Sequence, residues 1–173
     1  MSNTGNKIIV SPVDTRDYLY KNEGQELPLK YLAPSTPVRC KWFSSQCVAY
    51  ACTQALTQAY KLANNQVKLF SPGSLYANRE EDDYQGEGWY VRKALKQLHK
   101  YGVCLERDFH FPESYAKERQ KFLSRKEELL KLCEVYKIKS YFRCETAEDV
   151  KACIMKYGSV VISSKFTPKC FWK

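Results

Sequence analysis

The sequence lacks several features that would assign a protein to a class at once. No apolar run approaches the roughly 18 residues that a membrane-spanning helix needs. The first ten residues carry one lysine and a short Ile8-Ile9-Val10 run, which is not the pattern of a signal peptide. Histidine occurs only at His99 and His110, and no Cys-x-x-Cys pair is present, so we expect no metal site and no cofactor. These absences predict a cytoplasmic protein that does not enter a membrane.

What the sequence does contain is sufficient for one ordinary domain. The chain has 173 residues, 44% of them hydrophobic, and its 13 Tyr, 8 Phe and 3 Trp exclude a disordered polymer. A chain of this length buries roughly 70% of its unfolded surface, so its core needs no disulfides. Without an export signal, the eight cysteines are expected to be free thiols, most of them buried.

The positive charge is confined to the second half of the chain. Residues 1–90 hold 9 basic and 9 acidic side chains, whereas residues 91–173 hold 19 basic and 10 acidic ones, which accounts for the net charge of +9. These basic residues alternate with acidic ones at helical spacing, a pattern typical of a solvated helix face. We therefore expect no nucleic-acid partner.

Helices come first in the expected order of elements, and mixed elements follow, which defines an α+β chain. Apolar residues that recur at i+3 and i+4 predict helices over 46–62, 71–79, 90–101 and 113–135. Alternation over 136–144 and the apolar run 160–162 predict strands. A further helix is expected between them, from Thr146 to Tyr157-Gly158.

The ends of these elements carry recognisable signals. Ser44 or Ser45 is expected to cap the first helix, Gly102 to end the third, and Thr146 with Asp149 to form a box at the start of the last. Residues 1–36 show no sustained periodicity and predict an extended arm. The side chains expected to anchor this arm are those of Ile8, Val10, Tyr18 and Leu19.

Cys47 differs from the other cysteines in its expected position. It falls in the first turn of the first helix, where unpaired backbone amides and the positive end of the helix dipole favour an anion. A thiolate is the nucleophilic form of cysteine, and the nearby amides can stabilise an oxyanion. Most cysteines in such a position are structural, so the position alone leaves a buried, unreactive Cys47 as the alternative.

Six segments, taken in order, resemble the nucleophile-bearing left half of papain-like cysteine peptidases. The first, PVRCKWFSSQCVAYA at 37–51, is similar to the strand, loop and helix that carry the nucleophile in that family. The others are FSPGSLY at 70–76, GEGWY at 86–90, the AL…YGV pattern at 94–103, DFHF at 108–111 and YGSVV at 157–161. Together with Leu27-Pro28 they cover about residues 27–163, and the general appearance is closer to microbial or viral members than to secreted ones.

The resemblance implies a papain-like fold and hydrolysis of peptide bonds through an acyl-thioester on Cys47. It implies an arm over 1–36, a helical left domain over 37–135, and over 136–173 the incomplete beginning of a β-rich right domain. The backbone at Gly88 and Trp89 would pair with a peptide or protein substrate, and Trp89 would narrow the subsite there.

Two departures from the family pattern bear on catalysis. Lys41 occupies the position of the family's oxyanion-hole glutamine, and a lysine is a flexible point charge rather than a fixed amide donor. Gln46, adjacent to Cys47, is a poor substitute because its register is shifted. Neither His99 nor His110 matches the family's catalytic histidine, which lies beyond the segment present here together with its asparagine partner.

Three interpretations therefore stay open. The sequence is a truncated piece of a longer peptidase, or an inactive homologue that acts as an interaction or structural module, or one half of a site completed by a second chain.

Overall fold

The computed structural model describes residues 13–15, 17–40, 45–80, 88–110 and 115–163, and this part of the chain forms six helices. They are α1 (Cys47–Asn64), α2 (Pro72–Ala77), α3 (Val91–Lys100), α4 (Tyr115–Ser124), α5 (Lys126–Glu134) and α6 (Ala147–Tyr157). Within these ranges no helix has the length and apolar content needed to cross a membrane.

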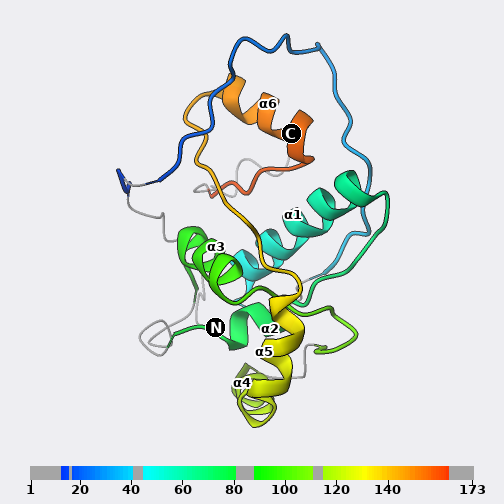
Figure 1. Cartoon of the computed structure of the whole chain (residues 1–173), viewed down its shortest axis with the longest axis vertical. Helices are drawn as coiled ribbons and strands as arrows, with labels where there is room; N and C mark the ends of the chain where they lie inside the picture. Colours follow the sequence, from blue (N-terminus) through cyan, green and yellow to red (C-terminus); the bar gives the residue numbers. More distant parts are fainter. Residues whose placement is uncertain (1–12, 16, 41–44, 81–87, 111–114, 164–173) are drawn as a thin grey trace, which may run out of the picture.

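The helices are arranged around α1, which contacts α2, α3 and α6 (Figure 1). Helices α4 and α5 lie at one end of the molecule, where α4 packs on α2, and α6 lies at the other end. One buried cluster joins α1 to α2, α3 and the segment around Phe70 and Val103. A second, between α2, α4 and α5, is formed by Ala77, Cys104, Phe109, Phe122, Leu129 and Cys133.

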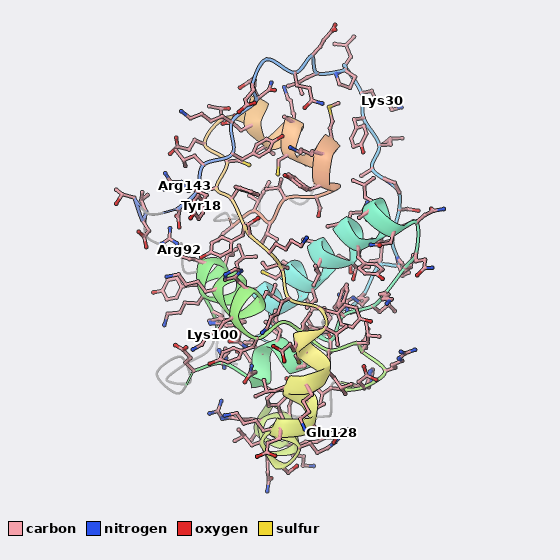
Figure 2. All side chains as sticks on the ribbon, in the orientation of Figure 1. Tyr18, Lys30, Arg92, Lys100, Glu128 and Arg143 are labelled. Atoms are coloured by element: carbon pink, nitrogen blue, oxygen red, sulfur yellow. The ribbon has the colours of Figure 1, made fainter. Side chains whose placement is uncertain are left out.

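Residues 17–40 run past α6 and then along α1 (Figure 1). Leu19 forms an isolated parallel bridge with Arg143, and the carboxylate of Asp17 forms ion pairs with Arg92 on α3 and with Arg143. Figure 2 shows Tyr18, Arg92 and Arg143 gathered at this edge. Further along, the backbone N–H of Asn22 donates to Asp149 Oδ1 at 2.8 Å. Residues 17–22, from the beginning of the described chain, therefore contact α3, Arg143 and the first turn of α6.

The expected anchors of the arm need correction. The side chain of Tyr18 is 75% exposed and that of Leu19 is exposed as well, so neither is buried in the body of the protein. The backbone makes the contact instead, through the hydrogen bonds Arg143 N–H to Tyr18 O at 2.8 Å and Tyr20 N–H to Arg143 O at 3.0 Å. Ile8 and Val10 lie outside the described residues.

Four of the predicted helices are confirmed within a few residues of their expected bounds, namely α1, α2, α3 and α6. The box at the start of α6 is present, since Asp149 N–H donates to Thr146 Oγ1 and Thr146 N–H donates to Asp149 Oδ2, each at 3.1 Å. The expected cap of α1 is wrong: Gln46 is the N-cap, and its side chain makes no capping hydrogen bond.

The long helix expected over 113–135 is two helices, α4 and α5. The break falls at Arg125, whose N–H donates to Phe122 O, while the hydroxyl of Ser124 donates back to Lys121 O at 3.0 Å. A serine that bonds to its own backbone competes with the helical pattern, which is why periodicity alone did not indicate the break.

The strands expected over 136–144 and 160–162 are not formed within the described residues. The first segment pairs with a neighbour only at Arg143, and a strand needs a partner over several residues. In the second, Val161 packs on the first core cluster, but Ile162 is 71% exposed and no paired segment accompanies it. The helical half of the α+β expectation is confirmed, and the β-rich right domain stays a prediction.

Gly102 ends α3 as expected, and it also meets α5. Its N–H donates to Leu98 O at 3.0 Å, and its φ of +78° lies in the left-handed region. A Cβ atom at this position would lie 2.0 Å from the backbone oxygen of Cys133, at the end of α5. A side chain at position 102 would therefore force α3 and α5 apart.

We expect Gly102→Ala to lower the free energy of unfolding by about 3 kcal/mol or more, because the left-handed backbone costs roughly 1–2 kcal/mol and the clash adds to it. Gly24→Ala is the matched control: its φ is +83°, but no atom lies within 4 Å of the added Cβ. Urea unfolding of both variants measures the difference. Equal losses would contradict the close approach of Gly102 to Cys133.

Candidate active site

Cys47 is the first residue of α1, as the sequence predicts. Its side chain is partly exposed, whereas Cys52, one and a half turns further along, is buried. The first turn of α1 contains no acidic residue of its own. The sulfur is therefore accessible to a reactant at the end of the helix where the backbone amides lack intrahelical partners.

Gln46, immediately before Cys47, is 1% exposed, and its side chain points into the protein. Its amide Nε2 donates to Glu118 Oε2 on α4 at 2.8 Å, a contact across 72 residues of sequence. The backbone oxygen of Gln46 accepts the N–H of Tyr50 at 2.9 Å and so begins the helix. An amide group held in this way is not presented to a substrate, which agrees with the expectation that Gln46 does not replace the oxyanion-hole glutamine.

Glu118 is a fully buried carboxyl group (0% exposed). Burial raises its pKa to about 8, although the hydrogen bond from Gln46 and the positive charge of Arg79 act in the opposite direction. Within the described residues, neither Glu118 Oε1 nor Gln46 Oε1 has a hydrogen-bond partner. A proton on Glu118 would remove the charge and supply a donor to this pocket.

Arg39 anchors the chain on the other side of residues 41–44. Its guanidinium donates to Gln54 Oε1 at 3.1 Å, to Thr53 Oγ1 at 3.0 Å and to the backbone oxygen of Phe70 at 2.6 Å. It also pairs with Glu106 at 3.3 Å. One planar cation thus joins the segment 17–40 to α1 and to the bridge between Phe70 and Leu105.

Arg79 holds the segment in which the sequence predicts substrate contacts. Its guanidinium lies 3.6 Å from the centre of the Tyr76 ring, and its Nη1 donates to Gly88 O at 3.0 Å. Trp89 is 4% exposed and packs edge-on against Tyr76, so its ring belongs to the core. Substrate binding by Gly88 and Trp89 stays a prediction. Trp89 and Ala49 are part of the same buried cluster, against which Val48 packs, so this segment and the start of α1 share one core.

The remaining residues singled out by the sequence are placed as follows. Lys41 lies outside the described residues, so its role in an oxyanion hole stays a prediction. His99 is exposed, with Nδ1 3.0 Å from Ile138 O, and His110 is exposed, 3.7 Å from Glu106. His110 borders a surface hollow of about 590 Å³ lined by residues 67–69 and 105–107, and Cys47 is not part of that lining.

Among the other described cysteines, Cys40 is exposed, whereas Cys52, Cys104 and Cys133 are buried. Burial raises the pKa of the Cys52 and Cys153 thiols to about 12, and it also raises the pKa of the partly exposed Cys144. Within the part of the chain that the structure describes, no three His, Cys, Asp or Glu side chains are grouped so as to hold a metal ion.

Glu118 and Arg79 are the residues that sequence reasoning missed. Both are charged residues, which usually lie at the surface of a protein, and the charge pattern of the segment carrying Glu118 predicts a solvent-exposed helix. A signal was nevertheless present, because Glu118 lies four residues before Phe122 and therefore on the apolar face of α4. Nothing local to Arg79 distinguishes it.

Among solved structures, the fold is similar to that of xylellain, a cysteine protease from Xylella fastidiosa. The TM-score is 0.70 at 26% sequence identity, and the match covers 84% of this chain and 61% of xylellain. This chain therefore spans less than two thirds of the length of that protein. No protein-family model and no curated protein matches the sequence. The chain has a cysteine-protease fold, consistent with the papain-like architecture that its motifs predict.

The buried acid predicts a specific pH dependence. The folded-state pKa of Glu118, about 8, exceeds the ordinary value of 4.5, so between these pH values the folded protein keeps a proton that the unfolded chain has released. The contribution of Glu118 to stability therefore falls as the pH rises through this window, by up to about 1.4 kcal/mol per pH unit. The charged and titratable neighbours acting with it are Arg79 and Tyr50.

Glu118→Gln removes this titration, so thermal unfolding should show the variant gaining stability relative to the wild type from pH 5 to pH 8. Glu128→Gln is the matched control, because that exposed carboxyl pairs with Arg125, which lowers its pKa and moves its titration below this window. Parallel curves for wild type and Glu118→Gln would contradict the buried, protonated acid.

Arg39→Lys is expected to lower the free energy of unfolding by about 2–3 kcal/mol, because an ammonium cannot satisfy the same set of acceptors. Arg107→Lys is the control, since the Arg107 side chain is exposed and pairs with Asp108 only at 3.8 Å. Urea titration with an unchanged m-value measures the loss. A similar effect at both positions would mean that the fork geometry of Arg39 does not matter.

Proposed function

We propose that this chain is the nucleophile-bearing part of a papain-like cysteine peptidase and that Cys47 attacks the substrate peptide bond. The observation that carries the proposal is a partly exposed cysteine at the first position of α1, in a chain whose fold matches a cysteine protease. The sequence pattern around Cys47 supports the same role.

In the proposed reaction the Cys47 thiolate forms a bond from Sγ to the carbonyl carbon, and the developing oxyanion is stabilised by the amides at the start of α1. The C–N bond then breaks, and the amine leaves with the proton that the thiol gave up. Water releases the acid from the thioester and restores the thiol. Lys41 would face the oxyanion, and the backbone around Gly88 and Trp89 would pair with the substrate near its P2 residue.

The proton transfers need an imidazole, and we propose that it comes from a further segment of the protein or from a second chain. Neither His99 nor His110 is well placed for the role. His99 Nδ1 lies 3.0 Å from Ile138 O, and His110 lies 3.7 Å from Glu106, beside a surface hollow whose lining does not include Cys47. The share of xylellain that this chain does not span leaves room for such a segment.

Alkylation of the protein with iodoacetamide at pH 6 tests the nucleophile, with the modified residues identified by peptide mass spectrometry. We expect Cys47 to react at least about tenfold faster than Cys40. Cys40 is the internal control, because it is more exposed but does not start a helix. A peptide bearing a vinyl sulfone should label the wild type and not Cys47→Ser.

Uniform slow modification of the cysteines, with no labelling of Cys47 by the peptide reagent, would contradict a peptidase. It would favour the alternative that the chain is an inactive homologue serving as an interaction or structural module. Should Cys47 react selectively, turnover is measured as the hydrolysis of a fluorogenic peptide library by the protein expressed from its full gene. Cys47→Ala in the same protein is the control.

A further inference from the structure

Gln46 connects Cys47 to a distant helix in an unusual way for an N-cap residue. An N-cap side chain ordinarily accepts from the free amides of the first turn, but Gln46 makes no such bond. Its amide donates instead to Glu118 on α4, while its backbone oxygen starts the hydrogen bonding of α1. The residue before Cys47 is therefore held at both its side chain and its backbone.

Glu118 is itself held on several sides. Its Oε1 lies 3.3 Å from the place a Cβ would take at Gly73 on α2, and the Phe109 ring approaches that place to 3.4 Å. The absence of a side chain at Gly73 therefore leaves space on α2 for the carboxyl group of Glu118. Two groups interact electrostatically with the Glu118 carboxylate, namely the guanidinium of Arg79 and the phenol of Tyr50 on α1.

A carboxyl group in this place is costly for the fold. A leucine at position 118 would occupy a similar volume between α2 and α4 without desolvating a polar group. What a leucine cannot do is accept the hydrogen bond of Gln46. The benefit of an acid at position 118 therefore lies at Gln46 and in the first turn of α1.

We propose that Glu118 is a positioning residue for Cys47: by holding Gln46 in the core it fixes the first turn of α1 and hence the place of the sulfur among the helix amides. This inference rests on the proposed role of Cys47 as a nucleophile. It adds a residue from α4, 71 positions away in the chain, to those on which the reactivity of that thiol depends.

The test is the ratio of the alkylation rates of Cys47 and Cys40 at pH 6, measured by peptide mass spectrometry in Glu118→Leu, Gln46→Ala and the double variant. We expect each single variant to lower the ratio about threefold to fivefold, because a loosened first turn stabilises the thiolate less. The double variant should fall no further than either single one, since both changes break the same link.

Two comparisons separate positioning from general destabilisation. Glu118→Gln should keep the wild-type ratio, because its amide oxygen can still accept from Gln46. Leu129→Ala, which truncates a buried side chain of α5 in the second core cluster, should lower the melting temperature and leave the ratio unchanged. Should Glu118→Leu fail to fold, Gln46→Ala against Glu118→Gln decides the question.

The outcomes distinguish this inference from the proposed function. A wild-type ratio near one refutes the nucleophile and the positioning role together. A high wild-type ratio that persists in Gln46→Ala, or additive losses in the double variant, overturns the role of Glu118 and leaves the peptidase proposal standing.

Discussion

Two residues that precede Cys47 in the chain, Arg39 and Gln46, are fixed to the protein by side-chain hydrogen bonds. The partly buried guanidinium of Arg39 donates to acceptors on α1 and at Phe70 and pairs with Glu106. The buried amide of Gln46, immediately before Cys47, donates to Glu118 on α4. Because buried polar groups without partners are costly, each of these side chains has few alternative arrangements. The residues that precede Cys47 are thus held by polar contacts as well as by apolar packing.

These contacts also explain how the two sides of the proposed site are related. Arg79 opposes the burial that raises the pKa of Glu118, and it donates to the carbonyl of Gly88, so Glu118 and the segment 88–89 have a common neighbour. The ring of Trp89 and the residues that follow Cys47 share one core cluster. A site assembled in this way depends on the registry of α1, α2 and α4 rather than on a single loop.

The structural features that the sequence predicts correctly are those whose signals lie within a few neighbouring residues. The helices α1, α3 and α6 follow from apolar spacing, from Gly102 and from the box at Thr146, all of which act within a few residues. The strands expected over 136–144 and 160–162 did not follow, because pairing needs a partner segment that alternation does not specify. Glu118 and Arg79 escaped notice because a charged residue becomes buried only through tertiary contacts, which no short pattern encodes.

The docking of the arm onto the far end of the chain has a consequence for the order of folding. Asn22 bonds to Asp149 across 127 positions, and Tyr31 approaches Met155 across 124. During synthesis the amino-terminal segment leaves the ribosome long before its docking surface exists, whereas α1 to α3 can pack as soon as they emerge. The arm is therefore a late-closing element whose contacts form only once α6 has been made, and their large sequence separation slows that final step.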